Sequence, residues 1–228
     1  MLSWPADHTL RIHLPAPLTP HTHALIRAIA ARLTAAPPLA ARDITPAAST
    51  LLITFDPLHP GFDPLRAEAH IREAIVSIDP AAAPPGRTID IPVCYDPEFA
   101  PDAADIARAN AIDPADIPAL HSASDYTVLF LGFSPGFGYL AGLPDTLAMP
   151  RLDTPRPRVA PGSVGIAGNQ TGIYPQATPG GWRLIGRTPL VMFDPARHEP
   201  ALLAIGDRVR FHPIPRAQFD ELLHHPML

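Results

Sequence analysis

The stretch YTVLFLGFSPGFGYLAGLP (126–144) decides the fold, because at Tyr126 helical patterns give way to short apolar runs separated by glycine and proline. Runs of the same kind follow: SVGIAG, QTGIY, GWRLIG, PLVMF and DRVRFHPI. Several short strands with regular turn signals are typical of a small closed β-barrel. Before the barrel we expect two short helices, over 102–110 and from Asp113 to about His121, the second opened by a capping aspartate and a proline.

The first 90 residues alternate between strand and helix signals. In chain order they are a strand at 9–14 (TLRIHL), a helix beginning at Thr19-Pro20, a weak strand near 40–45, a buried strand at 49–55 (STLLITF), a helix beginning at Asp63-Pro64, and a strand at 87–93 (RTIDIPV). This β-α-β-β-α-β order predicts a ferredoxin-like arrangement. The fold class is therefore α+β, with a ferredoxin-like domain over 1–86, a barrel domain over 87–216, and a terminal helix or tail over 217–228.

Composition excludes several classes of function. The 17 cationic residues are all arginine, so the chain cannot form a lysine Schiff base or supply the lysine of a phosphate-binding P-loop. A net charge of −5, spread thinly, predicts no nucleic-acid or membrane partner. The single cysteine, Cys94, forbids an internal disulfide, and no apolar run is long enough for a membrane span, so we expect a soluble cytoplasmic protein.

Within the opening stretch, Gly132-Phe133-Ser134-Pro135-Gly136 matches the G-x-S-x-G elbow of serine hydrolases. An elbow serine needs the backbone N–H of the next residue and a helix after it, but residue 135 is a proline and the following glycines disfavour a helix. We interpret the loop instead as a ligand-binding wall formed by Phe133, Phe137 and Tyr139. The alternative is a loop that aromatic side chains simply pack.

Further candidate site residues follow the loop. Gln170 and Tyr174 lie four apart on a predicted strand, hence on one face, where they could hold a polar ligand in a barrel mouth; ordinary structural hydrogen bonds are the alternative. Arg156 and Arg158 lie in a proline-stiffened segment that suits guanidinium capture of a carboxylate. We favour Arg158 for that role and expect Arg156 on a solvated face.

The histidines show no zinc-binding spacing, so we expect no metal site. His121, which ends a predicted helix just before the barrel, is the one histidine that we consider as a proton relay. A favourable interaction with the helix dipole is the alternative for this residue.

Four stretches together resemble a known family. They are IPVCYDPEFAPD (91–102), LHSASDYTVLFLGFSPGFGYLAGLP (120–144), TPRPRVAPGSVGIAGNQTGIYPQATPGGWRLIGRTPLVMFDP (154–195) and GDRVRFHPI (206–214). About 120 residues of the chain resemble the family of the 5-oxoprolinase B subunit, also called the KipI or allophanate hydrolase subunit 1 family. The resemblance implies that the barrel is cyclophilin-like and that the ferredoxin-like domain precedes it.

The resemblance also implies a function shared with other chains. Members pair with a C subunit and act with an A subunit in the ATP-dependent opening of 5-oxoproline (pyroglutamate) to glutamate. We therefore expect this chain to be inactive alone, to bind no cofactor itself, and to leave ATP mainly to another component of the complex. The alternatives are a KipI-like inhibitor of a sensor histidine kinase, a component of an enzyme for allophanate or urea, and, by analogy of fold alone, a prolyl isomerase.

Overall fold

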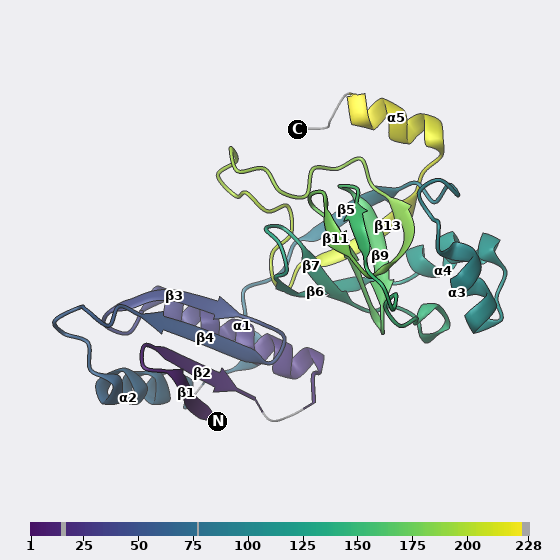
Figure 1. Ribbon diagram of the computed structural model, residues 1–228. Helices are drawn as coiled ribbons and strands as arrows, with labels where there is room; N and C mark the ends of the chain where they lie inside the picture. Colours follow the sequence, from purple (N-terminus) through teal and green to yellow (C-terminus); the bar gives the residue numbers. More distant parts are fainter. Residues whose placement is uncertain (15–16, 77, 225–228) are drawn as a thin grey trace. The chain divides into compact units, whose positions relative to one another are not determined.

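The computed structural model describes residues 1–14, 17–76 and 78–224 (Figure 1). The chain divides into two compact units, Met1–Pro85 and Gly86–Leu228. Both units mix helices and strands, so the fold belongs to the α+β class.

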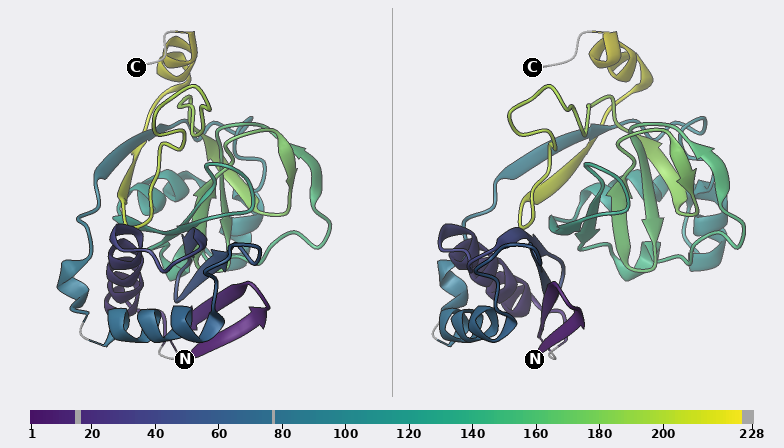
Figure 2. Two further views of the ribbon diagram at one scale, coloured as in Figure 1. Left: turned by 90° about the vertical axis from the view of Figure 1, so that its left-hand side faces the viewer. Right: turned by 60° about the vertical axis from the view of Figure 1, so that its left-hand side comes forward.

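The first unit is a sheet with helices on one face. Its described elements are β1 (Leu2–Ala6), β2 (Thr9–His13), α1 (Pro20–Ala35), β3 (Ala41–Pro46), β4 (Thr50–Phe55), α2 (Pro64–Ile75) and a 3₁₀ turn at Pro80–Ala82. The strands pair antiparallel in the order β1-β2-β4-β3. Figure 2 shows α1 and α2 on the same side of this sheet. The core between the sheet and the two helices is apolar and consists of Leu10, Ile12, Ile26, Ile29, Leu33, Leu51, Ile53, Phe55, Ala67 and Ile71.

Both helices of this unit begin where the sequence predicts. Thr19 caps α1, because its hydroxyl accepts from the backbone N–H of Thr22 while the Thr22 hydroxyl accepts from the N–H of Thr19. Asp63 caps α2 by accepting from the N–H groups of Leu65 and Arg66. A proline occupies the first position of each helix, where it has no N–H to leave unpaired.

The strand at 87–93 does not join this sheet, which corrects the predicted order. It forms β5 (Thr88–Val93) and pairs in parallel with a strand of the second unit, in register from Thr88 opposite Arg208 to Val93 opposite Pro213. The edge beside β2 is taken by β1, a strand that the sequence patterns did not predict. Alternating hydrophobicity identifies a strand and its buried face but does not name the strand's partner.

The second unit is built around a larger sheet. Its described elements are β5, α3 (Ala103–Asn110), a 3₁₀ turn at Pro114–Asp116, α4 (Ile117–Ser122), β6 (Tyr126–Leu131), β7 (Gly138–Ala141), a 3₁₀ turn at Asp145–Leu147, β8 (Arg156–Val159), β9 (Ser163–Ala167), β10 (Gln170–Ile173), β11 (Thr178–Gly180), β12 (Arg183–Arg187), β13 (Arg208–Pro213) and α5 (Arg216–His224). The end of the predicted tail, 225–228, lies outside the described residues.

The sheet of the second unit is a nearly closed barrel. Its strands follow the order β12-β9-β10-β7-β6-β13-β5, and β8 pairs separately with β11. Closure comes at Cys94 and Arg187, whose backbone groups exchange two hydrogen bonds of 2.8 Å. At this seam a Cβ on Gly186 would lie 2.7 Å from Cγ1 of Val93, so only glycine lets the strands approach this closely.

The barrel interior forms the core of the second unit. The buried core side chains come from most barrel strands and from α3 and α4, and include Val93, Ile106, Ile117, Tyr126, Val128, Leu140, Val164, Ile166, Ile173, Ile185, Val209 and Phe211. In Figure 1, α3 and α4 lie side by side next to the strands. None of the helices in the described residues combines the length and the apolar character needed to cross a bilayer.

Two glycines with a left-handed backbone differ in how closely other atoms surround them, so the same substitution at each tests the tightness of the packing. Gly162 (φ 79°) and Gly168 (φ 58°) both disfavour a side chain, but a Cβ on Gly162 would overlap the carbonyl oxygen of Thr188, whereas a Cβ on Gly168 meets no atom within 4 Å. We expect Gly168→Ala to lower the free energy of unfolding by about 1 kcal/mol through backbone strain alone. Gly162→Ala should cost roughly 1–3 kcal/mol more through overpacking.

Urea unfolding followed by the fluorescence of Trp182, in a Trp4→Phe background, measures the second unit, because those are the two tryptophans of the chain. Equal effects of the two substitutions would contradict the packing at Gly162.

Candidate functional site

Six aromatic rings form one cluster on the barrel. This aromatic cluster consists of Phe130, Phe133, Phe137, Tyr139, Tyr174 and Trp182. The rings come from β6, β7 and the loop between them, from the residue after β10, and from the residue before β12. The cluster therefore gathers residues from distant parts of the sequence, and it contains all three aromatic residues predicted from the loop.

Phe137 lies at the centre of the cluster and is almost fully buried. Its ring meets those of Tyr139, Tyr174 and Trp182 edge to face, with centroids 5.0, 5.4 and 5.4 Å away. These are favourable aromatic geometries. A Cβ on Gly172 would lie 2.9 Å from Cζ of Phe137, so glycine at this position makes room for the ring. Phe137 therefore forms the buried base of the cluster, called its floor below, and does not contact solvent.

Phe133 differs from Phe137 in both exposure and backbone. It is 61% exposed, and its φ of 68° is rare for a bulky residue. Its ring still lies 5.5 Å from that of Phe137 and 6.3 Å from that of Tyr174. Strained backbone persists where the surrounding structure imposes it, often at binding sites. An exposed aromatic ring held in this way over an aromatic floor is suited to contact a ligand.

Ser134 does not sit in an elbow geometry. The serine lies in a tight hairpin loop between the antiparallel strands β6 and β7, closed by the N–H of Gly132 donating to the carbonyl of Phe137, and a strand rather than a helix follows. This arrangement agrees with our rejection of a nucleophile. Its Oγ is nevertheless buried and makes no hydrogen bond within the described residues, as is also true of Oγ1 of Thr178. Each such group costs about 1–3 kcal/mol of stability.

Thr178 belongs to the surroundings of the same cluster. It pairs across the β8–β11 ladder with Val159, which packs with Phe137 and Tyr174. Two residues further, a Cβ on Gly180 would overlap the hydroxyl of Tyr174, so β11 lies directly against that ring. The two hydroxyls without partners thus lie in segments that flank the aromatic cluster.

Tyr174 lies inside the cluster and is almost fully buried, and burial is the main cause that raises the pKa of its phenol. Gln170 begins β10 and is half-buried, opposite Ala141 and Ala167. Four residues of extended chain separate the two side chains by about 13 Å. Both side chains nevertheless lie on the same face of β10, and Gln170 stands opposite Ala167, which packs with Phe137 and Tyr174, so Gln170 lies at the edge of the cluster.

Arg156 is not on a solvated face, which corrects the sequence-based expectation. Its Nη2 donates to both carboxylate oxygens of Asp102, at 2.8 and 2.9 Å, and Asp102 is buried. The same carboxylate accepts from the N–H of Leu184 at 2.6 Å. This ion pair ties β8 to the start of α3 and to β12, a structural role that the sequence did not reveal because the partner lies 54 residues away.

Arg158 is exposed on β8 and makes no ion pair within the described part of the chain. Its side chain projects to the strand face opposite that of Val159, which packs in the cluster. Arg151, which no sequence motif indicated, is a second cation without an ion pair among the described residues. Its guanidinium carbon lies 5.9 Å from the centre of the Trp182 ring, a cation–π contact. Both arginines are available to an anionic ligand.

His121 lies in the barrel core with no exposed surface. The Tyr95 hydroxyl lies 2.8 Å from Nδ1, Nε2 lies 3.0 Å from Oγ1 of Thr171, and that threonine donates to the carbonyl of Gly165. Because the threonine proton is used, Nε2 must donate and Nδ1 must accept, which defines one neutral tautomer. Burial lowers the pKa of His121 to about 3. This environment supports a structural role for His121 in the core.

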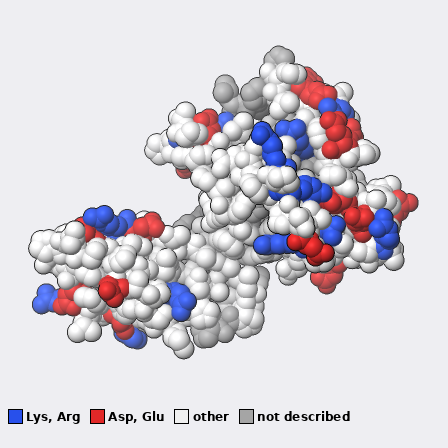
Figure 3. All heavy atoms as spheres, in the orientation of Figure 1, with Lys and Arg blue, Asp and Glu red and all other residues white. Residues whose placement is uncertain are grey.

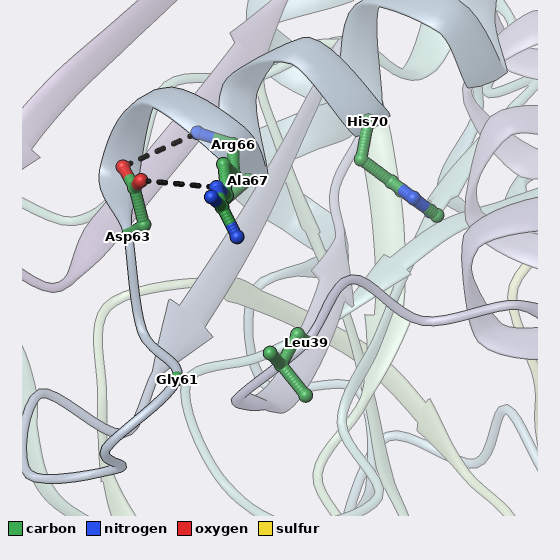
Figure 4. A pocket seen from close by; sticks show the side chains of 6 residues that line it. All are labelled: Leu39, Gly61, Asp63, Arg66, Ala67 and His70. Carbon is green, nitrogen blue, oxygen red and sulfur yellow. Dashed lines mark hydrogen bonds and ion pairs between the residues drawn. The ribbon is translucent and has the colours of Figure 1, made fainter.

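Outside the aromatic cluster, the described residues form mixed surface charges and a hollow whose polar groups have partners. On the face in Figure 3, the cationic and acidic side chains of the second unit lie next to one another rather than in separate areas. A hollow of about 170 Å³ in the first unit is lined by Leu39, Gly61, Asp63, Arg66, Ala67 and His70 (Figure 4). Its polar groups are engaged: Asp63 caps α2 and pairs with Arg66, and Nε2 of His70 lies 3.2 Å from the Ala36 carbonyl oxygen. No cluster of metal-ligating side chains occurs in the part of the chain that the structure describes.

Comparison with known proteins places the chain in a family. Residues 2–203 match the family of the carboxyltransferase domain, subdomain C and D, and the chain belongs to this family. It is 50% identical over 125 residues to the 5-oxoprolinase B subunit of Bacillus subtilis (strain 168), covering 55% of this chain and 52% of that one. It is 53% identical over 133 residues to the 5-oxoprolinase B subunit of Escherichia coli O157:H7, covering 58% and 61%. The matches thus span about half to three fifths of these relatives.

Solved structures share the fold. The protein TTHA0988 is 34% identical, with a TM-score of 0.78 over 90% of this chain and 39% of its own. The conserved uncharacterized protein PH0987 from Pyrococcus horikoshii is 36% identical, with a TM-score of 0.57 over 96% of this chain and all of its own. The K. lactis urea amidolyase, 18% identical, has a TM-score of 0.75 over 98% of this chain and 15% of its own, a likeness of fold alone.

The two neighbouring arginines of β8 should respond differently to the same substitution. Arg156→Gln leaves the buried carboxylate of Asp102 without its cation and should cost about 2–4 kcal/mol of unfolding free energy. Arg158→Gln breaks no ion pair within the described residues and should change stability by less than about 0.5 kcal/mol. Urea unfolding monitored by Trp182 fluorescence measures both, and equal stability of the two variants would contradict the ion pair as a structural link.

His121 should make the stability of the second unit depend on pH. The folded pKa lies below the ordinary value of 6.5, so the unfolded chain binds the proton first, and stability is full above pH 6.5 and falls as the pH drops toward 3. Between pH 6.5 and 5 the loss should approach about 2 kcal/mol. His121→Gln should remove this slope.

If the glutamine variant does not fold, the imidazole can be observed directly. NMR of the ring nitrogens in the unsubstituted protein should report the neutral Nε2–H tautomer down to about pH 5, well above the lowered pKa. Protonation of this ring near its ordinary pKa would contradict its burial.

Proposed function

We propose that this chain is the B subunit of an ATP-dependent 5-oxoprolinase, acting with the A and C subunits to open 5-oxo-L-proline to L-glutamate. The observation that carries the proposal is the 50–53% identity to three proteins named as B subunits of 5-oxoprolinase. The net chemistry adds water across the ring amide while ATP is hydrolysed to ADP and phosphate. The chain itself contains no lysine for a P-loop, which supports binding of ATP on another component of the complex.

In this proposal the rim of the aromatic cluster holds the substrate. The exposed ring of Phe133 and the half-buried ring of Tyr139 would pack on the apolar carbons of the lactam and keep out water, as a preformed apolar pocket wall does. Arg158, exposed on β8 and without an ion pair in the described residues, would pair with the substrate carboxylate. Tyr174 within the cluster and Gln170 at its edge, on the same face of β10, would orient the ring amide.

The fold supports a finer description as well. The second unit would be the cyclophilin-like barrel of the family. The first would be a variant of the ferredoxin-like arrangement in which β1 takes the place of the last strand. The single buried cysteine is consistent with a reducing cytoplasm. Alone, the chain would be inactive, because the proposed reaction needs an ATP site that another component supplies.

Reconstitution tests the function. A mixture of the A and C subunits with this chain, ATP and 5-oxoproline should release glutamate, and omission of this chain should abolish release. Full turnover without the chain would overturn the proposal.

The carboxylate assignment has its own test. Arg158→Gln should raise KM for 5-oxoproline about tenfold or more, because a charge-assisted contact is worth about 1.5–3 kcal/mol. Arg151→Gln, at the second of these cations, is the matched comparison. An unchanged KM for Arg158→Gln together with a raised KM for Arg151→Gln would instead assign the substrate carboxylate to Arg151, which lies over the Trp182 ring.

A further inference from the structure

Helix α5 is attached to the second unit through a small set of contacts. Among the described residues of this helix, Phe219 is the one with a buried side chain. Figures 1 and 2 show α5 at the outside of the unit, away from α3 and α4, whose buried residues belong to the barrel core. A helix of nine residues is too short to be stable alone in water, so these contacts decide whether α5 stays in place.

The ring of Phe219 bridges the two sides of the barrel seam, where the backbone groups of Cys94 and Arg187 pair. On one side, its centroid lies 4.7 Å from that of Phe99, in the loop that follows Cys94. On the other side, it lies 5.8 Å from the guanidinium carbon of Arg187, which is itself 5.6 Å from the Phe99 ring. One side chain of α5 therefore contacts both the chain that leaves β5 and the end of β12.

Arg216, the first residue of α5, contacts the same loop. Its guanidinium carbon lies 4.6 Å from the centre of the Phe99 ring, and its side chain forms ion pairs with Glu98 and Asp220. Both ion pairs are partly exposed, and exposed pairs add little to stability. The attachment of α5 therefore depends mainly on the burial of the Phe219 ring.

We propose that α5 is a releasable strap across the barrel seam. While Phe219 is docked, it holds the loop after β5 against β12; when α5 undocks, the pairing of Cys94 with Arg187 opens and the rest of the barrel stays folded. Elements held by few buried contacts open at a lower free energy than the whole domain. The opening reaches the core, because Tyr95 follows Cys94 and its hydroxyl lies 2.8 Å from Nδ1 of His121. The inference is independent of the proposed function, since all of these contacts lie within the second unit.

Amide hydrogen exchange of the unsubstituted full chain, followed by NMR at increasing urea concentrations, tests the strap directly. The N–H groups of Phe219, Cys94 and Arg187 are all hydrogen-bonded, as are those of Val128 and Tyr174 elsewhere in the barrel, which serve as comparison amides. The first three should exchange faster than the comparison amides and with little dependence on urea, because a local opening exposes little surface. Exchange of all five groups only through global unfolding, with the full urea dependence, would overturn the proposal.

Phe219→Ala connects the opening of the seam to the strap. Loss of the buried ring should accelerate exchange at Cys94 and Arg187 about tenfold or more, while the comparison amides keep their rates. Leu223→Ala is the matched control, because Leu223 lies on the same helix and is 47% exposed. This control should change the seam rates by less than about twofold.

Two results with Phe219→Ala would contradict the strap. An equal acceleration at the seam and at the comparison amides would make α5 an ordinary part of the cooperative barrel fold. Unchanged exchange at Cys94 and Arg187 would show that the seam closes without α5. If Phe219→Ala does not fold, the unsubstituted chain still decides between local and global opening.

Discussion

Closure of the barrel is the constraint on which the second unit depends. The sheet is completed by one pair of backbone hydrogen bonds between Cys94 and Arg187, at a point where Gly186 must pass within van der Waals reach of Val93. This bridge covers the ends of β5 and β12 at the seam, and the barrel encloses an interior apolar enough to hold a neutral histidine. The order of the strands around this ring brings the loop after β6, the end of β10 and the start of β12 to one side, where the aromatic cluster forms.

The cluster combines two kinds of contribution to a site. Its interior, centred on the buried Phe137, contributes rigid packing that stabilises the barrel. Its periphery departs from the rules of stable packing through an exposed Phe133 with positive φ and, among the described residues, two buried hydroxyls without hydrogen-bond partners. Departures of this kind reduce stability and are retained where they serve binding. Their concentration around one floor distinguishes this region from the hollow in the first unit, whose polar groups are engaged.

Much of the fold could be predicted because local physics determines it. The capped helix starts at Thr19 and Asp63 and the change of pattern at Tyr126 each depend on neighbouring residues, and the structure confirms them. The partner of the strand at 87–93 could not be predicted, since parallel pairing with β13 joins residues that lie far apart in the sequence. The same limit applies to the site. The glycine-rich loop indicated that its aromatic residues lie together, whereas the contacts of Arg156, Arg151 and Thr178 exist only in the tertiary structure.

The position of Cys94 has a practical consequence for studying motion. The chain contains one thiol, it is buried at the seam of the barrel, and burial raises its pKa. Alkylating reagents reach such a sulfur only when the surrounding structure opens. The rate of its modification therefore reports how often β5 parts from β12, without any added label, and a bound substrate or partner protein that braces the ring would slow that rate.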